Sequence, residues 1–230
     1  MNHPPPPQDA RKALVAQAAL RYVAPNSIIG VGTGSTVNKF IEALGSIAQT
    51  VRGAVSSSNA STERLRALGI AVLDANAVDM LDIYIDGADE IDNKGYMVKG
   101  GGAALTREKI VAAQSRRFIC IADDSKRVNV LGRFPLPVEI IPMACAHICR
   151  RFADMGARAE LRLQSDGSPL LTDNGQHILD VHGLHIHDPL TFETAVNQWP
   201  GVITVGVFAH QKAHVCLLGT ANGVQELIFN

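Results

Sequence analysis

Residues 27–36 read Ser-Ile-Ile-Gly-Val-Gly-Thr-Gly-Ser-Thr, an apolar run that enters a glycine turn and then a group of hydroxyl side chains. The apolar part predicts a buried β-strand, and Val37–Leu44 predicts the helix that follows it. The pattern recurs, with strands expected at 51–55, 70–73, 82–86 and 118–122 and helices at 9–23, 61–68 and 109–117. Strands that alternate with helices predict an α/β fold with a parallel sheet and right-handed crossovers.

Polar or glycine-containing turns follow four of these strands, after residues 31, 55, 85 and 122. In a parallel sheet the carboxyl ends of the strands lie at one edge, and ligands of open α/β sheets bind beyond that edge. The turns are therefore expected to face the same side of the sheet.

The pattern changes near Leu131, where prolines flank short apolar runs. Short antiparallel strands are expected at 159–163, 170–171 and 176–181, helices at 144–155 and 191–197, and a further strand at 202–208. A strand at 213–218 is expected to return to the first sheet. The expected regions are a flexible Pro-rich tail at 1–10, a catalytic domain formed by 11–131 and 207–230, and a smaller α+β domain at 132–206.

The composition excludes several classes of function. The chain has 230 residues, 47% of them hydrophobic, and a formal net charge of -1, so no basic excess favours a nucleic-acid partner. No apolar run approaches the roughly 20 residues that cross a bilayer, and the N-terminus lacks the order of a signal peptide. We expect a cytoplasmic protein without a membrane partner. Its four cysteines form no CxxC pair, so reduced thiols are expected.

The loop Gly32–Thr36 is the first candidate site. Its glycines and hydroxyls suit phosphate binding through backbone N–H and side-chain O–H groups. It is not a P-loop, which needs GxxxxGK[ST], and Val37 stands where GxGxxG needs its third glycine. A phosphate site and an ordinary capped strand–helix turn are equally compatible with this loop.

The segment Lys99–Lys109 is the second candidate. Three glycines at 100–102 can turn their backbone N–H groups toward an anionic or hydroxyl-rich ligand, and the helix that follows adds its own N-terminal N–H groups. Glu108 lies within the first turns of that helix. A lysine, a polar nest and a positioned acid predict a catalytic site for a small, charged, oxygen-rich molecule.

Two further groups follow strands. The acidic turn Asp86–Asp92 can orient sugar hydroxyls or act in acid–base catalysis, and it lacks the spacing of a calcium loop. Lys126 adds a cation just after another strand. The histidines at 182, 185 and 187 lack a cysteine or acid at ligand spacing, so we expect no metal there.

Several motifs together resemble ribose-5-phosphate isomerase type A. They are GVGTGSTVNKFIEAL, GAVSSSNASTERLRALGI, IYIDGADEID, VKGGGAALTREKIV and FICIADDSK, followed by LGRFPLPVEIIP, and later TDNGQHILDVHG and PGVITVGVF. The resemblance covers nearly the whole chain from about residue 11. It implies a Rossmann-like domain with a mostly parallel sheet and helices on both faces, a smaller α+β domain, and homodimers or homotetramers. It also implies interconversion of D-ribose 5-phosphate and D-ribulose 5-phosphate, in the pentose phosphate pathway, with no metal or other cofactor.

The resemblance also places functional residues. It implies that Glu108 is the catalytic base, with Lys99 and Asp86 as further catalytic groups. Substrate-binding positions fall on Thr33, Gly34, Ser35, Thr36, Asp86, Gly87, Ala88, Asp89, Lys99, Gly100, Gly101, Gly102 and Lys126. Phosphate contacts are open between Arg11 and Lys12.

The chemistry of an aldose–ketose isomerase agrees with these positions. One carboxylate can move a proton between C2 and C1, and Lys99 with the glycine N–H groups can stabilise the enediolate oxygen. Two rival functions remain: a CoA transferase-like enzyme, in which a glutamate is the nucleophile, and a non-catalytic domain that senses a sugar phosphate.

Overall fold

The computed structural model describes residues 7–229. By its internal contacts the chain divides into a first unit, formed by 7–88, 110–127 and 213–229, and a second unit, formed by 89–109 and 128–212. The segments 89–109, 128–131 and 207–212, which were expected in the first region, group here with the second. Pro4–Pro6 of the expected tail lie outside the described residues, and helix α1 begins at Gln8.

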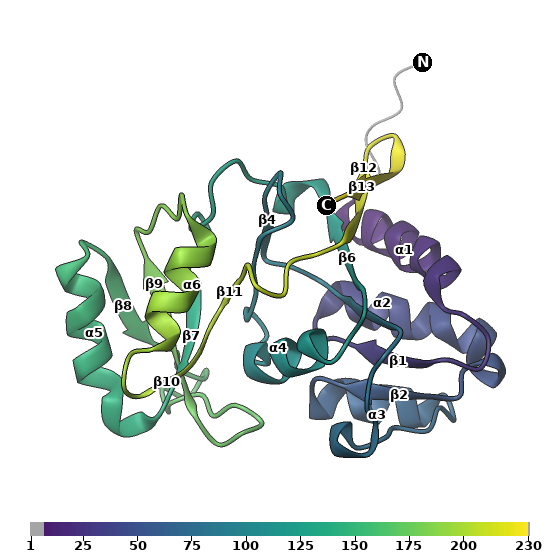
Figure 1. Ribbon diagram of the computed structural model, residues 1–230, viewed down its shortest axis with the longest axis horizontal. Coiled ribbons are helices and arrows are strands. Elements are labelled where there is room, and N and C mark those ends of the chain that lie inside the picture. Colours follow the sequence, from purple (N-terminus) through teal and green to yellow (C-terminus); the bar gives the residue numbers. More distant parts are fainter. Residues whose placement is uncertain (1–6, 230) are drawn as a thin grey trace. The chain divides into compact units, whose positions relative to one another are not determined.

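The first unit is built on a six-stranded sheet of order β13-β12-β6-β3-β1-β2 (Figure 1). The strands are β1 (Ile28–Val31), β2 (Gly53–Ser56), β3 (Ile83–Asp86), β6 (Phe118–Asp123), β12 (Val215–Thr220) and β13 (Gly223–Ile228). All neighbours pair in parallel except β12 and β13, which are antiparallel. The prediction of a mostly parallel α/β sheet is confirmed, as is the return of the chain to it after residue 213. Strand β13 was not predicted.

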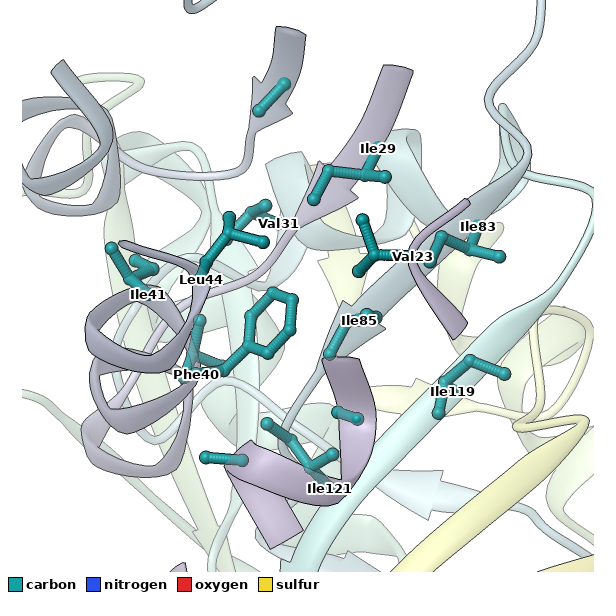
Figure 2. Packing of buried hydrophobic residues seen from close by; sticks show 14 of the residues in the cluster. Val23, Ile29, Val31, Phe40, Ile41, Leu44, Ile83, Ile85, Ile119 and Ile121 are labelled. Atoms are coloured by element: carbon teal, nitrogen blue, oxygen red, sulfur yellow. The ribbon is translucent and has the colours of Figure 1, made fainter. Parts of the chain in front are cut away.

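Helices cover both faces of this sheet. They are α1 (Gln8–Ala19), α2 (Ser35–Leu44), α3 (Asn59–Ala67) and the end of α4 (Leu105–Ala113). Alternate strand residues face the core formed with α1 and α2, and Figure 2 shows Phe40 of α2 beside Val31 and Ile85. The intervening residues face α4, since a Cβ on Gly30 would lie 2.8 Å from both Tyr84 and Val111. Truncating a fully buried side chain such as Phe40 to alanine costs about 3–5 kcal/mol.

The second unit has two smaller sheets and is α+β, as predicted. One sheet has the order β10-β7-β9-β8, all antiparallel, and the other has the order β11-β5-β4. The strands are β4 (Glu90–Ile91), β5 (Met97–Val98), β7 (Leu136–Ile140), β8 (Arg158–Leu161), β9 (His177–His182), β10 (Val202–Val205) and β11 (Val207–Phe208), and the helices are α5 (Cys145–Asp154) and α6 (Pro189–Asn197). The strands expected at 70–73 and 170–171 do not form. Single bridges, Ala54 to Val72 and Leu163 to Pro169, lie in their place.

The central strand β7 has two different faces. Leu136, Val138 and Ile140 point into a core that includes residues of both α5 and α6. Because side chains alternate along a strand, Pro137 and Glu139 point the other way. Pro137 packs near Gly100, and Glu139 accepts a hydrogen bond from Thr106. One face of this sheet is therefore packed core, and the other supports the segment that carries the predicted site.

Within residues 7–229, no helix combines the length and the apolar character needed to cross a membrane.

Candidate active site

The predicted site residues fall in both units. The second unit holds Lys99, the glycines at 100–102, Asp89 and Glu108, and the first unit holds the loop at 33–36, Asp86–Ala88 and Lys126.

Lys99 and Glu108 form a buried ion pair in the second unit. The Nζ atom of Lys99 lies 3.3 Å from Oε2 of Glu108, and the two side chains are 3% and 4% exposed. Glu108 is in the first turn of α4, where the helix dipole stabilises a carboxylate by about 0.3–1 kcal/mol. A carboxylate held in a nearly dry site beside an ammonium group can exchange a proton with a bound substrate while the ammonium balances negative charge.

The backbone of Lys99 is fixed by strand pairing. Its N–H donates to the carbonyl of Gly206 at 2.8 Å, and the N–H of Gly206 donates to the carbonyl of Pro137 at 2.8 Å. A Cβ on Gly206 would lie 2.4 Å from the Lys99 carbonyl oxygen. Only glycine allows this approach, so Gly206 determines where the Lys99 side chain begins.

The glycine loop is ordered by Asp89. Oδ2 of Asp89 accepts the Gly101 N–H at 2.8 Å, and the Ala103 N–H closes a turn onto the Gly100 carbonyl at 2.9 Å. Gly100 has φ +107°, a conformation that few other residues adopt. Gly100 is buried, whereas Gly101 and Gly102 are exposed. The structure thus brings Asp89 and the loop together.

The start of α4 is anchored by polar contacts beyond the predicted site. The Thr106 hydroxyl donates to Glu139, which also accepts from Thr172 at 2.7 Å. The Arg107 guanidinium donates to Oδ1 of Asn174 at 2.8 Å and to the carbonyl of Asp173 at 2.6 Å. The residues on either side of Thr106–Arg107 therefore have little freedom to move.

Lys109, next to Glu108, forms a second buried ion pair with Glu193 of α6. Its ammonium group also donates to the carbonyls of Val205 at 2.9 Å and Val207 at 2.7 Å. Burial lowers the pKa of Lys109 from its usual value, although the charge of Glu193 acts in the opposite direction. The ring of Phe208 lies 4.6 Å from this ammonium group and 5.4 Å from that of Lys99.

Asp86 organises the predicted site of the first unit. It ends β3 and is fully buried. Its Oδ1 accepts the N–H groups of Thr33 at 3.0 Å and Gly87 at 2.7 Å, and its Oδ2 accepts the Tyr84 hydroxyl. A Cβ on Gly32 would lie 1.9 Å from the carboxylate carbon. Glycine at 32 is therefore required for the loop to pack against Asp86.

The loop at 33–36 continues from this contact into α2. The Thr33 hydroxyl is 2.9 Å from that of Ser57, and Nζ of Lys12 donates to the Ser35 hydroxyl at 3.0 Å. Gly34 has φ +115° and leads into the helix that begins at Ser35. The helix N-terminus, the hydroxyls and the Lys12 ammonium group suit an anion.

Lys126 ends a short 3-10 helix, Asp124–Lys126, directly after β6. Burial alone would raise the pKa of the preceding Asp123, but hydrogen bonds from Ser125 and Gln8 outweigh it and hold the pKa below its usual range. Arg11 forms an ion pair with Asp124. This differs from Lys12, whose contact is with the loop itself.

Several supporting residues were not predicted from the sequence. Tyr84 could have been found, because it lies two residues before Asp86 and so shares its face of the strand. Glu193 and Glu139 gave no signal, because their partners are 84 and 33 residues away in the chain. Across residues 7–229, no three His, Cys, Asp or Glu side chains are grouped so that they could hold a metal ion.

Comparisons with known proteins show the family of this chain. A family model, ribose 5-phosphate isomerase A (phosphoriboisomerase A), matches residues 53–223. The chain is 68% identical to the ribose-5-phosphate isomerase A of Polaromonas sp., covering 99% of this chain and 98% of that protein. It is 68% identical to that of Albidiferax ferrireducens, covering 96% and 94%.

Solved structures show the same fold. The isomerase of Neisseria gonorrhoeae superposes with a TM-score of 0.94 at 45% identity, covering 98% of this chain and 99% of that one. A D-ribose-5-phosphate isomerase in complex with phospho-erythronic acid superposes with a TM-score of 0.93 at 35% identity, covering 97% and 100%. The fold and these relatives define an enzyme of the aldose–ketose isomerase class. The chain belongs to the ribose 5-phosphate isomerase A family.

Proposed function

We propose that this enzyme interconverts D-ribose 5-phosphate and D-ribulose 5-phosphate through an enediolate. The observation that carries the proposal is the buried Lys99–Glu108 pair, with 3.3 Å between Nζ and Oε2, directly beside an ordered glycine loop. The relatives bear the name of this activity.

Glu108 is the proposed base. Its carboxylate takes the proton from C2 of the open-chain aldose and returns it to C1, while the hydroxyl proton of O2 passes to O1. The two transfers convert the aldose to the ketose without any net redox change. Negative charge develops on the oxygen of the enediolate. The Lys99 ammonium group and the N–H groups of the glycine loop, other than that of Gly101, which Asp89 holds, stabilise it, because fixed donors in a site of low polarity need no reorganisation during the reaction.

Asp86 and Asp89 have orienting roles in this proposal. Asp86 assists the opening of the furanose ring, and the N–H groups of Thr33 and Gly87 hold its carboxylate in one orientation. Asp89 orients substrate hydroxyls while it fixes the Gly101 amide. Gly87 and Ala88, which lie between these two acids in the sequence, supply backbone contacts to the substrate.

The phosphate is assigned to the loop at 33–36 and to Lys126. Between the two open candidates, the contacts favour Lys12, because its ammonium group lies 3.0 Å from the Ser35 hydroxyl. The Arg11 side chain is 19% exposed and already neutralised by Asp124. Replacing Lys126 by alanine should mainly raise KM, and an unchanged KM removes this residue from the phosphate site.

We further propose that the enzyme acts in the non-oxidative branch of the pentose phosphate pathway, in the cytoplasm, without a metal, and as a homodimer or homotetramer. Light scattering coupled to size exclusion gives the oligomeric state directly. A fluorescent fusion gives the location.

The deciding experiment measures formation of ribulose 5-phosphate from ribose 5-phosphate, with and without EDTA. We expect turnover that survives the chelator and falls by a factor on the order of 10² or more in Glu108→Gln, because the general base is lost. Near-normal turnover in Glu108→Gln refutes the role of Glu108. If no preparation converts ribose 5-phosphate and a glutamyl–CoA thioester forms on incubation with an acyl-CoA, the transferase is favoured. If the protein binds ribose 5-phosphate tightly but does not convert it, a sensor is favoured.

A further inference from the structure

Arg162 directly follows β8, the edge strand of the second unit's larger sheet, and its side chain contacts the glycine loop at 100–102. Its Nε donates to Oδ2 of Asp180 at 2.8 Å, and its Nη2 donates to Oδ1 of the same carboxylate. Its Nη1 donates to the carbonyls of Gly100 at 3.0 Å and Gly101 at 3.1 Å. One guanidinium thus uses three nitrogens, two on a carboxylate and one on the loop that follows Lys99.

The contact with Asp180 gives the guanidinium a fixed position. Both oxygens of the carboxylate are engaged, and such two-pronged pairs set the plane of the guanidinium as well as its distance. Asp180 lies in β9, opposite Pro137 of β7. The Arg162 side chain is 15% exposed and that of Asp180 is 22% exposed. Arg162 is therefore anchored to a paired strand rather than to a loop.

The two carbonyl contacts also fix the direction of two N–H groups. In a planar trans peptide, the N–H of one residue points opposite to the C=O of the residue before it. With the Gly100 carbonyl on Arg162, the Gly101 N–H points away, and there it meets Oδ2 of Asp89 at 2.8 Å. With the Gly101 carbonyl on Arg162, the Gly102 N–H also points away from the guanidinium.

A run of three glycines needs such an external constraint. Glycine has access to both signs of φ, so the peptides between glycines can rotate at little cost. Asp89 holds one of these amides, and the Ala103 N–H holds the Gly100 carbonyl from within the turn. For the Gly101–Gly102 peptide, the contact within the described residues is the one from Arg162.

We propose that Arg162, anchored by Asp180, is a positioning residue for the isomerisation: it orients the glycine peptides so that the Gly102 N–H is presented to the oxygen of the enediolate. The inference rests on the proposed function, in which the glycine loop stabilises that oxygen. Arg162 itself touches the loop and acts through it. Donors that act on charge present only in the transition state affect kcat more than KM.

The test compares Arg162→Met, Arg162→Lys and Asp180→Asn with a matched control, Arg158→Met. Arg158 lies four positions earlier, on β8, and pairs with Glu160 at the surface. For each variant we would measure kcat and KM for ribose 5-phosphate, and the inhibition constant of phospho-erythronic acid, whose carboxylate resembles the planar, anionic enediolate. Thermal unfolding shows whether each variant is folded.

In Arg162→Met we expect kcat to fall about tenfold or more, which is a smaller loss than the roughly 10²- to 10³-fold that follows removal of a whole oxyanion donor. KM should stay within about twofold. Binding of phospho-erythronic acid should weaken in step with kcat. Arg162→Lys keeps the charge but lacks the planar guanidinium with its paired donors, so its kcat should fall nearly as far. The kcat of Asp180→Asn should fall less. A fifth variant, Arg162→Ala, leaves room for a small guanidinium, and added methylguanidine should restore part of its kcat. Arg158→Met should be unchanged.

An unchanged kcat in folded Arg162→Met overturns the inference, as does a rise in KM that accounts for the whole loss. If Arg162→Met does not fold, Arg162→Lys and Asp180→Asn decide the question by the same criterion, namely whether kcat falls while KM stays nearly unchanged. Failure of the proposed function is distinguishable, because it requires an inactive wild-type enzyme or an active Glu108→Gln variant, neither of which depends on Arg162.

Discussion

Glu108 and Lys109 are neighbours on α4, and each enters a buried ion pair, but the two pairs are built differently. The ammonium group of Lys109 uses its three donors on Glu193 and on two carbonyls, and Glu193 also accepts the N–H groups of Ala209 and His210. These contacts tie α4 to α6 and to the chain around β11. The Lys99–Glu108 pair is joined at 3.3 Å beside the exposed glycines of the loop.

The contrast separates two uses of buried charge. A pair whose donors and acceptors are filled by the protein holds segments together, and removing one partner leaves a buried charge that is expensive to keep. A pair next to an accessible loop can exchange one partner for a substrate. We therefore propose that Lys109–Glu193 gives structural support and that Lys99–Glu108 takes part in the chemistry.

The largest expected effect is on the activity of a variant of the Lys99–Glu108 pair. In Glu108→Gln, kcat should fall by about 10² to 10⁴, because the proton carrier is lost. The glutamine amide keeps the shape of the side chain and can still accept a hydrogen bond from Lys99, but the buried ammonium group loses its counter-charge. The free energy of unfolding, measured with urea, should therefore fall, but by less than in Glu193→Ala. A loss of stability that matches the loss of activity would assign this pair the same role as its neighbour.

The reverse result is expected for the supporting pair. Glu193→Ala should lower the free energy of unfolding by about 3–5 kcal/mol, because the Lys109 ammonium group stays buried without its carboxylate. Urea denaturation measures this change. At a temperature at which the variant is folded, kcat should fall less than in Glu108→Gln. Stability equal to the wild type, with kcat strongly reduced, would exchange the two assignments.

A smaller effect concerns pH. Burial lowers the pKa of Lys109 from its ordinary value of 10.5. Between the lowered pKa and 10.5 the unfolded chain binds more protons than the folded one, so this group's contribution to stability rises with pH across that window. Below the lowered pKa the cost of keeping the charge buried is fully present. The stability of the wild type relative to Lys109→Met should therefore improve as pH rises toward 10.5, as measured by urea unfolding of both proteins.

The smallest effect is expected at an exposed ion pair of the first unit. Lys39 lies 3.5 Å from Asp9 and 3.6 Å from Glu42, whose side chains are 74% and 60% exposed. Solvent screens such contacts, so Lys39→Gln should change the free energy of unfolding by about 0.5 kcal/mol or less. A change as large as that of Glu193→Ala would mean that burial does not explain the difference between ion pairs in this protein.

The sequence alone predicted the parts of the fold that depend on local patterns. The run at 27–36 predicted β1, its turn and α2, and the repeat of this unit predicted the parallel sheet. Strands β4 and β5 have two residues each, too few for a period to be visible. The segment 170–171 is apolar, but Leu171 is 60% exposed, so its hydrophobicity gave a false strand.

The candidate site was predictable to a similar degree. Lys99, Glu108 and Asp89 were identified from short motifs, and the structure brings them into contact with each other or with the glycine loop. Their supports were not predictable, because Arg162 and Gly101 are 61 residues apart. Such contacts depend on tertiary packing, and no local pattern in the sequence indicates them.

The two faces of β7 have a consequence for variation along the strand. Leu136, Val138 and Ile140 lie in a packed core, while Pro137 and Glu139 lie against the glycine loop and the start of α4. All five side chains are buried, so in a library that samples every substitution at 136–140 abundance in the cell should fall at every position, whereas turnover per folded molecule should fall most at 137 and 139. Five consecutive positions would thus carry two interleaved sets of constraints, one from the packed core and one from the contacts that hold the glycine loop and α4.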